Sequence, residues 1–276
     1  MKRIFLSVCL AMVAAVLYGC SGLRVDAAGY TDSTMVPLPM EFKGIDVEDA
    51  IEVVFGGVGD EAFIESDANL LPYIEVYETR GLLKIRFSDD IHLRGNRWNH
   101  LHTIVKIPYK NGVNTVSVSG ASSFSSGVPF TGTSFSVSAS GASEVICDID
   151  VTDNIMVDLS GAASLQCGTV RAARMYIDAS GASSFSASGM VSECEMSLSG
   201  ASSIESAPGT DRYSLRLDKC TGDLSGASSA VFCSDGFIAC SLSGGSHIYF
   251  KGGADSKRSD CSGGSSIEWD GYLLYE

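Results

Sequence analysis

The sequence predicts an all-β protein that coils as a single-stranded parallel β-helix (a β-solenoid), right-handed and with about 20 residues per rung. Three observations predict this fold. A small, uncharged pentapeptide close to SGASS occurs eight times, the copies recur at a nearly constant spacing, and the residues before each copy alternate between apolar and polar. Together these features describe short strands joined by tight turns and stacked at a fixed period.

The spacing of the pentapeptides sets the length of a rung. Successive central glycines are 21, 20, 20, 19, 26, 18 and 19 residues apart. A β-propeller blade needs about 40 residues, so this period favours a solenoid. The longest interval predicts an additional loop around residues 207–210. The predicted corner glycines are Gly120, Gly141, Gly161, Gly181, Gly200, Gly226, Gly244 and Gly263.

The residues around each glycine predict a strand followed by a corner. Apolar residues tend to stand six, four and two positions before the glycine and four positions after it. Mostly polar residues stand between them, which is the two-residue period of a strand with one buried face. Glycine supplies a turn with dihedral angles that larger residues avoid. Its small neighbours, Ser before it and Ala or Gly after it, allow corners to stack about 4.8 Å apart.

The N-terminus predicts export and a lipid anchor. A basic start, an apolar run over residues 4–18 and the tetrapeptide LYGC ending at Cys20 are typical of a lipoprotein signal. We predict that residues 1–19 are removed and that Cys20 is lipidated; the alternative is an ordinary thiol after an ordinary signal. The anchor would hold the exported protein in the cell envelope, at the outer membrane, with the leaflet left open.

The rest of the chain divides by composition. Residues 20–37 are small and polar, and we predict the lipidated Cys20 and a flexible tether there. Residues 38–276 predict the solenoid, with eroded rungs and a cap over 38–112 and SGASS-type rungs over 113–276. The net charge of −14 argues against nucleic acid as a partner. Nothing in the sequence predicts a cofactor.

Three blocks carry a family resemblance: FKGIDVEDAIEVVF over residues 42–55, DANLLPYIEVYETRGLLKIRF over 67–87, and the repeated VxLSGASS. In this order they resemble the autotransporter-adhesin head GIN domain family across about residues 38–270. The resemblance implies a β-solenoid exported by a Gram-negative bacterium, often as a lipoprotein. It brings no catalytic residues with it, and the cysteine content of this chain departs from the family.

Two pairs of cysteines occupy equivalent positions on consecutive rungs. Cys147 and Cys167 each lie six residues after a corner glycine, and Cys194 and Cys220 each lie six residues before one. Stacked residues about 4.8 Å apart are within the reach of a disulfide, so both pairs are candidate disulfides. The alternative is that all four are small apolar residues of the core.

Aspartates form the candidate ligand face. Asp158 and Asp178 are predicted neighbours on consecutive rungs, and Asp148 and Asp150 lie two residues apart on one strand face. Paired carboxylates can bind a cation or act as acid and base on a glycan. The alternative is a solvated acidic face that keeps strands apart from other molecules. No basic residue recurs beside these acids, so we predict no catalytic residue.

Three histidines, His92, His100 and His102, are close together in sequence, which makes metal binding conceivable. The alternative is a polar loop and strand start beside Trp98. The chain has no CxxC motif, so we predict no metal site.

The sequence therefore predicts a non-catalytic, adhesin-like module that binds glycans or proteins of the envelope or of a host. Extended solenoid faces suit this role, and Trp98, Tyr249 and Trp269 are candidate exposed aromatic residues for it. The alternative is a β-helix enzyme that acts on polysaccharide, as a lyase or a glycoside hydrolase, with acids converging on one rung face.

Overall fold

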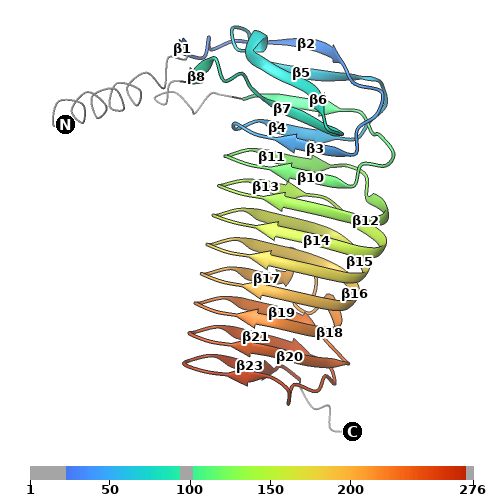
Figure 1. Ribbon diagram of the computed structural model, residues 1–276, viewed down its shortest axis with the longest axis vertical. Helices are drawn as coiled ribbons and strands as arrows, with labels where there is room; N and C mark the ends of the chain where they lie inside the picture. The colour runs from blue at the N-terminus through green and yellow to red at the C-terminus, as the bar shows by residue number, and fades with distance from the viewer. Residues whose placement is uncertain (1–22, 94–101, 272–276) are drawn as a thin grey trace, which may run out of the picture.

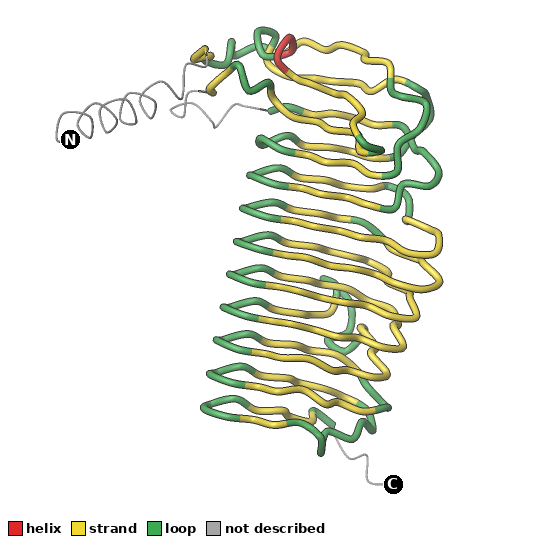
Figure 2. The backbone as a smooth tube through the Cα atoms, viewed as in Figure 1, coloured by secondary structure: helices red, strands yellow, loops and turns green. Residues whose placement is uncertain are grey.

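The computed structural model describes residues 23–93 and 102–271. This part of the chain consists of strands, turns and one short 3₁₀-helix, and it contains no α-helix. Figures 1 and 2 show an elongated stack of flat rungs, with the N-terminal strands at one end and the C-terminal strands at the other. The prediction of an all-β fold is confirmed.

Most of the stack is built from the SGASS repeats. Strand pairs here are parallel and join residues one repeat apart, so that Leu159 lies beside Ala179 and Ala179 beside Leu198. Twenty-one strands form one hydrogen-bonded sheet, and β16, β17, β19 and β18 close a small ring of pairings within it. The repeat strands are β10 (Thr115–Val118), β11 (Ser123–Ser126), β12 (Phe130–Ala139), β13 (Glu144–Ile146), β14 (Ile149–Leu159), β15 (Ser164–Ala179), β16 (Ser184–Leu198), β17 (Ser203–Ser206), β18 (Leu215–Leu224), β19 (Ser229–Cys233), β20 (Phe237–Leu242), β21 (His247–Lys251), β22 (Asp260–Cys261) and β23 (Ser266–Trp269).

The apolar columns of the sequence form the core inside the stack. On β15, for example, the alternate residues Met175, Ile177 and Ala179 are buried while the residues between them are exposed. The residue four after each corner glycine is also buried in most rungs, as Leu165 and Phe185 show. Burial of apolar area, at about 25 cal/mol per Å², is a main contribution to the stability of this core.

The corner glycines hold the left-handed conformation in all eight rungs, with φ between 72° and 78°. From Gly141 to Gly263 the backbone also leaves no room for a side chain. A Cβ atom on Gly181 would lie 2.5 Å from the carbonyl oxygen of Gly161 on the preceding rung. The amide of Ala182 donates to that same oxygen at 2.7 Å. Glycine is therefore required both by the dihedral angles and by the close approach of the next rung.

Serine two residues after the corner glycine points into the stack rather than out of it. The hydroxyl of Ser202 donates to the carbonyl oxygens of Ala179 and Ser199 at 3.1 and 3.0 Å. The hydroxyls of Ser143 and Ser183 have no hydrogen-bond partner in the structure. Ala163 occupies the same position in another rung and is equally buried. The column is thus defined by small size, and a hydroxyl is a benefit only where a carbonyl is in reach.

The N-terminal part is not a simple continuation of the coil. Strands β3 (Gly44–Val47) and β4 (Glu52–Phe55) pair with β10 and β11 on one side and with β7 (Leu82–Phe87) and β9 (Ile104–Ile107) on the other. The rung formed by β7 and β9 follows the rung of β3 and β4 in sequence. In the stack, however, it lies on the N-terminal side of β3 and β4, away from β10 and β11. The strands of this part are thus not stacked in the order of the sequence. The cause is the antiparallel hairpin of β6 (Ile74–Thr79) and β7, which returns the chain to the outer side of β3.

The remaining N-terminal strands close this end of the stack. β2 (Thr31–Pro37) pairs antiparallel with β5 (Glu61–Asp67), which pairs with β9, and the 3₁₀-helix η1 (Leu71–Tyr73) leads into β6. β1 (Leu23–Val25) and β8 (Ile91–Leu93) form a separate parallel pair. The prediction of a flexible tether over 20–37 is thus wrong for residues 23–25 and 31–37. β2 is exposed along nearly its whole length, so it carries no apolar alternation by which the sequence could reveal it.

The additional loop of the long repeat lies where it was predicted. Residues 207–214 form turns between β17 and β18, and the hydroxyl of Thr210 donates to the carbonyl oxygen of Ala207 at 2.6 Å. The loop does not disturb the stack, because β18 resumes its pairing with β16 at Leu215.

A corner substitution tests the double requirement for glycine. We expect Gly181→Ala to lower the free energy of unfolding by about 3 kcal/mol, since it combines left-handed strain of about 1–2 kcal/mol with a backbone clash. Gly209→Ala is the matched control: φ is 79° there, but nothing lies within 4 Å of the added carbon. It should lose only the strain. Denaturant unfolding measures both, and equal losses would refute the role of close stacking.

The buried serine column gives an opposite pair of outcomes. Ser183→Ala removes a buried hydroxyl without a partner, so stability should stay equal or rise by about 1 kcal/mol. Ser202→Ala removes a hydroxyl with two carbonyl partners and should cost about 1 kcal/mol. Thermal and denaturant unfolding of the two variants would contradict this reading if Ser183→Ala proved the more damaging of the two.

Candidate binding face

The outward side chains of the strands that lead into the corners form a flat surface along the stack. We call it the repeat face; it extends over β12, β14, β15, β16 and β18. Its residues stand three and five positions before the corner glycines, so each rung contributes two of them in register. A shallow hollow of about 470 Å³ lies on this face. The outward residues that line it are Ser136, Ser138, Met156, Asp158, Tyr176, Asp178, Glu195, Ser197 and Asp223.

Two large apolar side chains stand side by side on the repeat face. Met156 is 58% exposed and Tyr176 is 40% exposed, and they are paired residues on β14 and β15. Both take positions where the other rungs of this face carry Ser136, Glu195 and Thr221. Exposed apolar groups that adjoin one another on a polar surface are typical of a contact site. Tyr176 was not singled out from the sequence, although its place in a polar column is a signal that could have found it.

The structure brings together only two of the four predicted aspartates. Asp158 and Asp178 are paired, exposed neighbours on β14 and β15, next to Met156 and Tyr176. Asp150 lies at the other end of β14, 3.9 Å from Arg171. The carboxylate of Asp148 accepts a hydrogen bond from the amide of Thr169 at 2.7 Å, which is a structural role.

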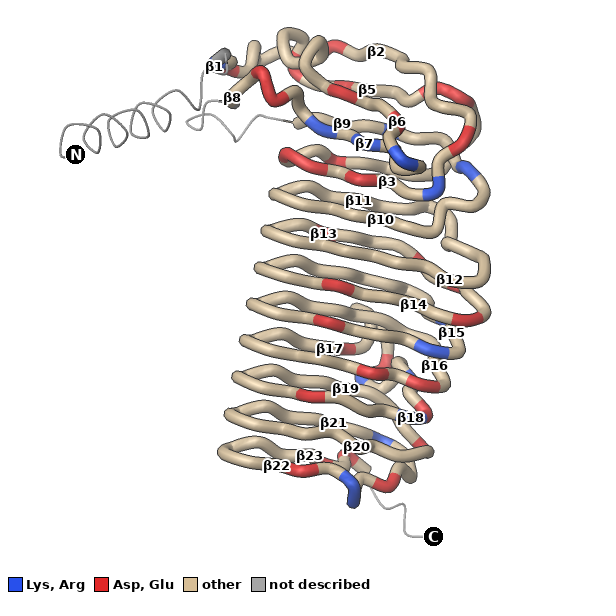
Figure 3. The backbone as a smooth tube through the Cα atoms, in the orientation of Figure 1, with Lys and Arg blue, Asp and Glu red and all other residues tan. Residues whose placement is uncertain are grey.

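Charged side chains border the face on one side. Lys219 donates to the carboxylate of Glu193 at 2.7 Å, and this hydrogen bond lowers the pKa of Glu193 from its ordinary value. Arg174 binds both Asp153 and Asn154. A second hollow of about 230 Å³ lies between these residues and Tyr176. Figure 3 shows that the charged residues of the repeat rungs lie along the strands, away from the corners.

The four predicted cysteines are buried and are free thiols in the structure. Cys194 and Cys220 are paired residues on β16 and β18, yet the sulfur of Cys220 is 3.9 Å from that of Cys240. Contact with Cys147 and burial raise the pKa of Cys167, and burial raises that of Cys194. Such thiols behave as small apolar core residues, which is the alternative that the sequence left open. The two disulfides stay predictions.

The other predicted residues do not join the repeat face. His92 lies on β8 and His102 precedes Thr103, both exposed, whereas Cys20, Trp98 and His100 lie outside the described residues. Trp269 is 48% exposed on the last strand, where its indole nitrogen donates to the carbonyl of Gly252. Tyr249 lies beneath the guanidinium of Arg212, with 5.3 Å between the guanidinium carbon and the ring centroid.

Across residues 23–93 and 102–271, no group of three or more His, Cys, Asp or Glu side chains is placed to hold a metal ion. In the same residues, no helix has the length and apolar character needed to cross a bilayer.

Solved structures share this fold. A putative adhesin from Parabacteroides merdae is 14% identical, with a TM-score of 0.74 over 90% of this chain and 99% of its own. A putative adhesin from Parabacteroides distasonis is 18% identical, with a TM-score of 0.73 over 89% and 99%. A third structure, described as a putative lipid binding protein from Parabacteroides distasonis, is 13% identical, with a TM-score of 0.69 over 89% and 99%. At these low identities the comparison shows a shared fold and nothing about function.

No curated protein matches the chain. The family model "Putative auto-transporter adhesin, head GIN domain" matches residues 41–254, from just before β3 to the turn after β21. This confirms the resemblance carried by the three sequence blocks. The chain belongs to the auto-transporter adhesin head GIN domain family.

Proposed function

We propose that the protein is a non-catalytic, adhesin-like binding module whose repeat face binds extended glycans of the envelope or of a host. The observation that carries the proposal is the pairing of Met156 with Tyr176, flanked in register by Asp158 and Asp178. Sugar rings present apolar faces edged by hydroxyl groups. An exposed aromatic ring can pack against the apolar face of a sugar, and carboxylates accept hydrogen bonds from its hydroxyl groups.

We also propose that the stacked rungs are turns of a single-stranded, right-handed parallel β-helix. The parallel, in-register pairing of consecutive repeats supports this architecture. A linear ligand that ran along such a stack would meet equivalent positions about every 4.8 Å. The face therefore suits a repeating polymer better than a compact ligand.

The arrangement of the acids supports binding rather than cleavage. Glycoside hydrolases place two carboxylates about 5–10 Å apart on opposite sides of the scissile bond. Asp158 and Asp178 instead stand side by side on an open surface and point the same way out of adjacent strands. The alternative, a polysaccharide-cleaving enzyme, would need an acid on the far side of a cleft.

Membership of an adhesin family indicates an exported protein of the cell surface or envelope. We propose in addition that Cys20 is lipidated after removal of residues 1–19 and holds the protein at the outer membrane. The LYGC tetrapeptide at the end of an apolar run supports this. The membrane would then be a partner through the anchor alone.

A glycan array followed by a reducing-end assay tests the binding proposal. The double variant Met156→Ser, Tyr176→Ala should weaken binding of any glycan hit by roughly tenfold or more, since burial of a large apolar side chain contributes about 1.5–3 kcal/mol. Tyr30→Ala is the matched control, because Tyr30 is exposed but lies in the N-terminal part. Binding unaffected by the double variant would refute the role of the repeat face, and release of new reducing ends would favour the enzyme.

Metabolic labelling tests the anchor. Cells that express the full chain should incorporate radioactive palmitate into the protein, and Cys20→Ser should abolish this label because it removes the acylated sulfur. A variant of a buried thiol, Cys147→Ser, is the control and should keep the label. Equal label in wild type and Cys20→Ser would contradict the lipoprotein assignment.

A further inference from the structure

One rung has no glycine at its corner. The register of β3 with β10 and of β4 with β11 places Asp49 at the position of Gly120, and Ala50 at that of Ala121. Both residues are left-handed, with φ of 67° and 62°. This conformation costs energy for a residue with a Cβ atom, although less for aspartate than for most, and the eight equivalent residues are glycines. Figure 3 shows acidic residues at this corner and none at the corners of the SGASS rungs.

The structure explains why a side chain fits at this corner. At the seven glycines from Gly141 to Gly263, an added Cβ would lie 2.4–2.8 Å from the carbonyl oxygen of the preceding corner. Asp49 has no such corner beside it, because β7 runs straight on through Phe87 where the other rungs turn. The chain then continues into β8. The space that a corner would fill is instead an open pocket of about 450 Å³.

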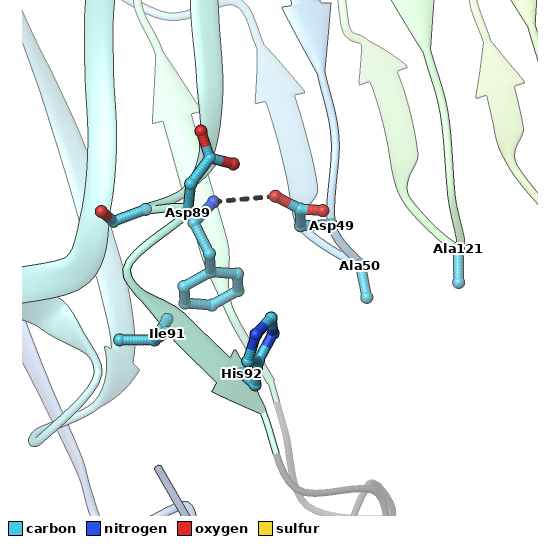
Figure 4. A pocket seen from close by; sticks show the side chains of 8 residues that line it. Asp49, Ala50, Asp89, Ile91, His92 and Ala121 are labelled. Atoms are coloured by element: carbon cyan, nitrogen blue, oxygen red, sulfur yellow. Dashed lines mark hydrogen bonds between the residues drawn. The ribbon is translucent and has the colours of Figure 1, made fainter. Parts of the chain in front are cut away.

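The pocket combines one available carboxylate with an apolar wall. Asp49 uses one oxygen to accept a hydrogen bond from the amide of Phe87 at 3.2 Å. Its neighbours Glu48 and Asp89 are each paired with a basic residue, Lys84 and Arg86. Among the described residues Asp49 forms no ion pair. Figure 4 shows Asp49 and Ala50 on one side of the pocket and Ile91 and His92 on the other.

The lining selects among ligand classes. Two carboxylates, Asp49 and Asp89, disfavour an anion. A bare metal ion needs several ligands in close geometry, and no such group is present in the described part of the chain. Phe87, Ile91, Ala50 and Ala121 make about half of the lining apolar. An ammonium group on a short carbon stem meets both requirements: the charge faces Asp49, and the stem lies on the apolar wall.

We propose that this Asp49 pocket binds a primary ammonium group that adjoins an apolar surface, as in a lysine side chain or on the C–H face of an amino sugar. The left-handed aspartate is retained because its carboxylate points into the space where the preceding rung omits its corner. Strained residues that persist in a fold are often found at ligand sites. The site is separate from the repeat face and does not depend on the proposed glycan binding.

An NMR titration with n-butylammonium chloride tests the site, with n-butanol as the neutral ligand of similar shape. The protein should bind n-butylammonium, and Asp49→Asn should weaken that binding roughly tenfold by removing a charge-assisted hydrogen bond. Asp60→Asn removes the same charge from an exposed turn between β4 and β5, outside both the pocket and the repeat face, so it should leave the affinity unchanged. Affinity equal for both ligands, or lost equally in both variants, would overturn the proposal.

A second variant separates binding from folding. Asp49→Gly restores the residue of the other eight corners, so it should unfold at higher denaturant concentration than wild type while losing n-butylammonium binding. Retained binding in this variant would overturn the proposal. Glucosamine against glucose, and Nα-acetyl-lysine amide against its norleucine analogue, then distinguish an amino sugar from a lysine side chain. No preference for the amine in either pair would also overturn it.

Discussion

The amide that follows each corner glycine donates to the carbonyl oxygen of the corner glycine one rung earlier, and this hydrogen bond repeats at 2.7 Å from Ala142 to Gly264. The ladder requires a left-handed residue at each step and a backbone approach that excludes a Cβ atom. These two conditions fix where the rungs from Gly141 to Gly263 turn. A fixed turn also fixes the register of the strands on both sides of it. Because the strands are in register, the apolar columns of successive rungs meet inside the stack.

The same constraint decides where chemistry can be placed. The corners consist of Ser, Gly and Ala, so the edge of the stack that they form carries no long side chains. Functional groups must therefore stand in the outward columns of the strands. On the repeat face these columns hold Met156, Tyr176 and paired aspartates. The proposed function rests on this surface and not on a cleft. The Asp49 pocket is the exception, and it exists where the corner ladder has no preceding member.

The repeat half of the fold was predictable because its side chains report its period directly. Gly120 and its seven equivalents give the corners, and Leu159, Ala179 and Leu198 give the stacking. The N-terminal order was not predictable, since the antiparallel return of β6 to β7 reverses the order of two rungs without changing their strand-like alternation. β2 escaped notice because it is held by backbone hydrogen bonds to β5 and buries little. In the candidate site, the pairing of Asp158 with Asp178 followed from the period. The importance of Asp49 did not, because only the conformation shows that it occupies a glycine position.

The two ends of the stack are closed differently. At the N-terminal end, antiparallel strands β2 and β5 cover the outermost rung, whereas β22 and β23 at the other end pair on one side only within the described residues. Each intermediate rung recognises its neighbours through backbone groups and small corners that are the same in every copy. Tandem duplication or loss of one repeat in the gene would therefore lengthen or shorten the molecule without requiring any new kind of contact. Selection can adjust its reach by copy number alone while the sequence of the terminal cap stays unchanged.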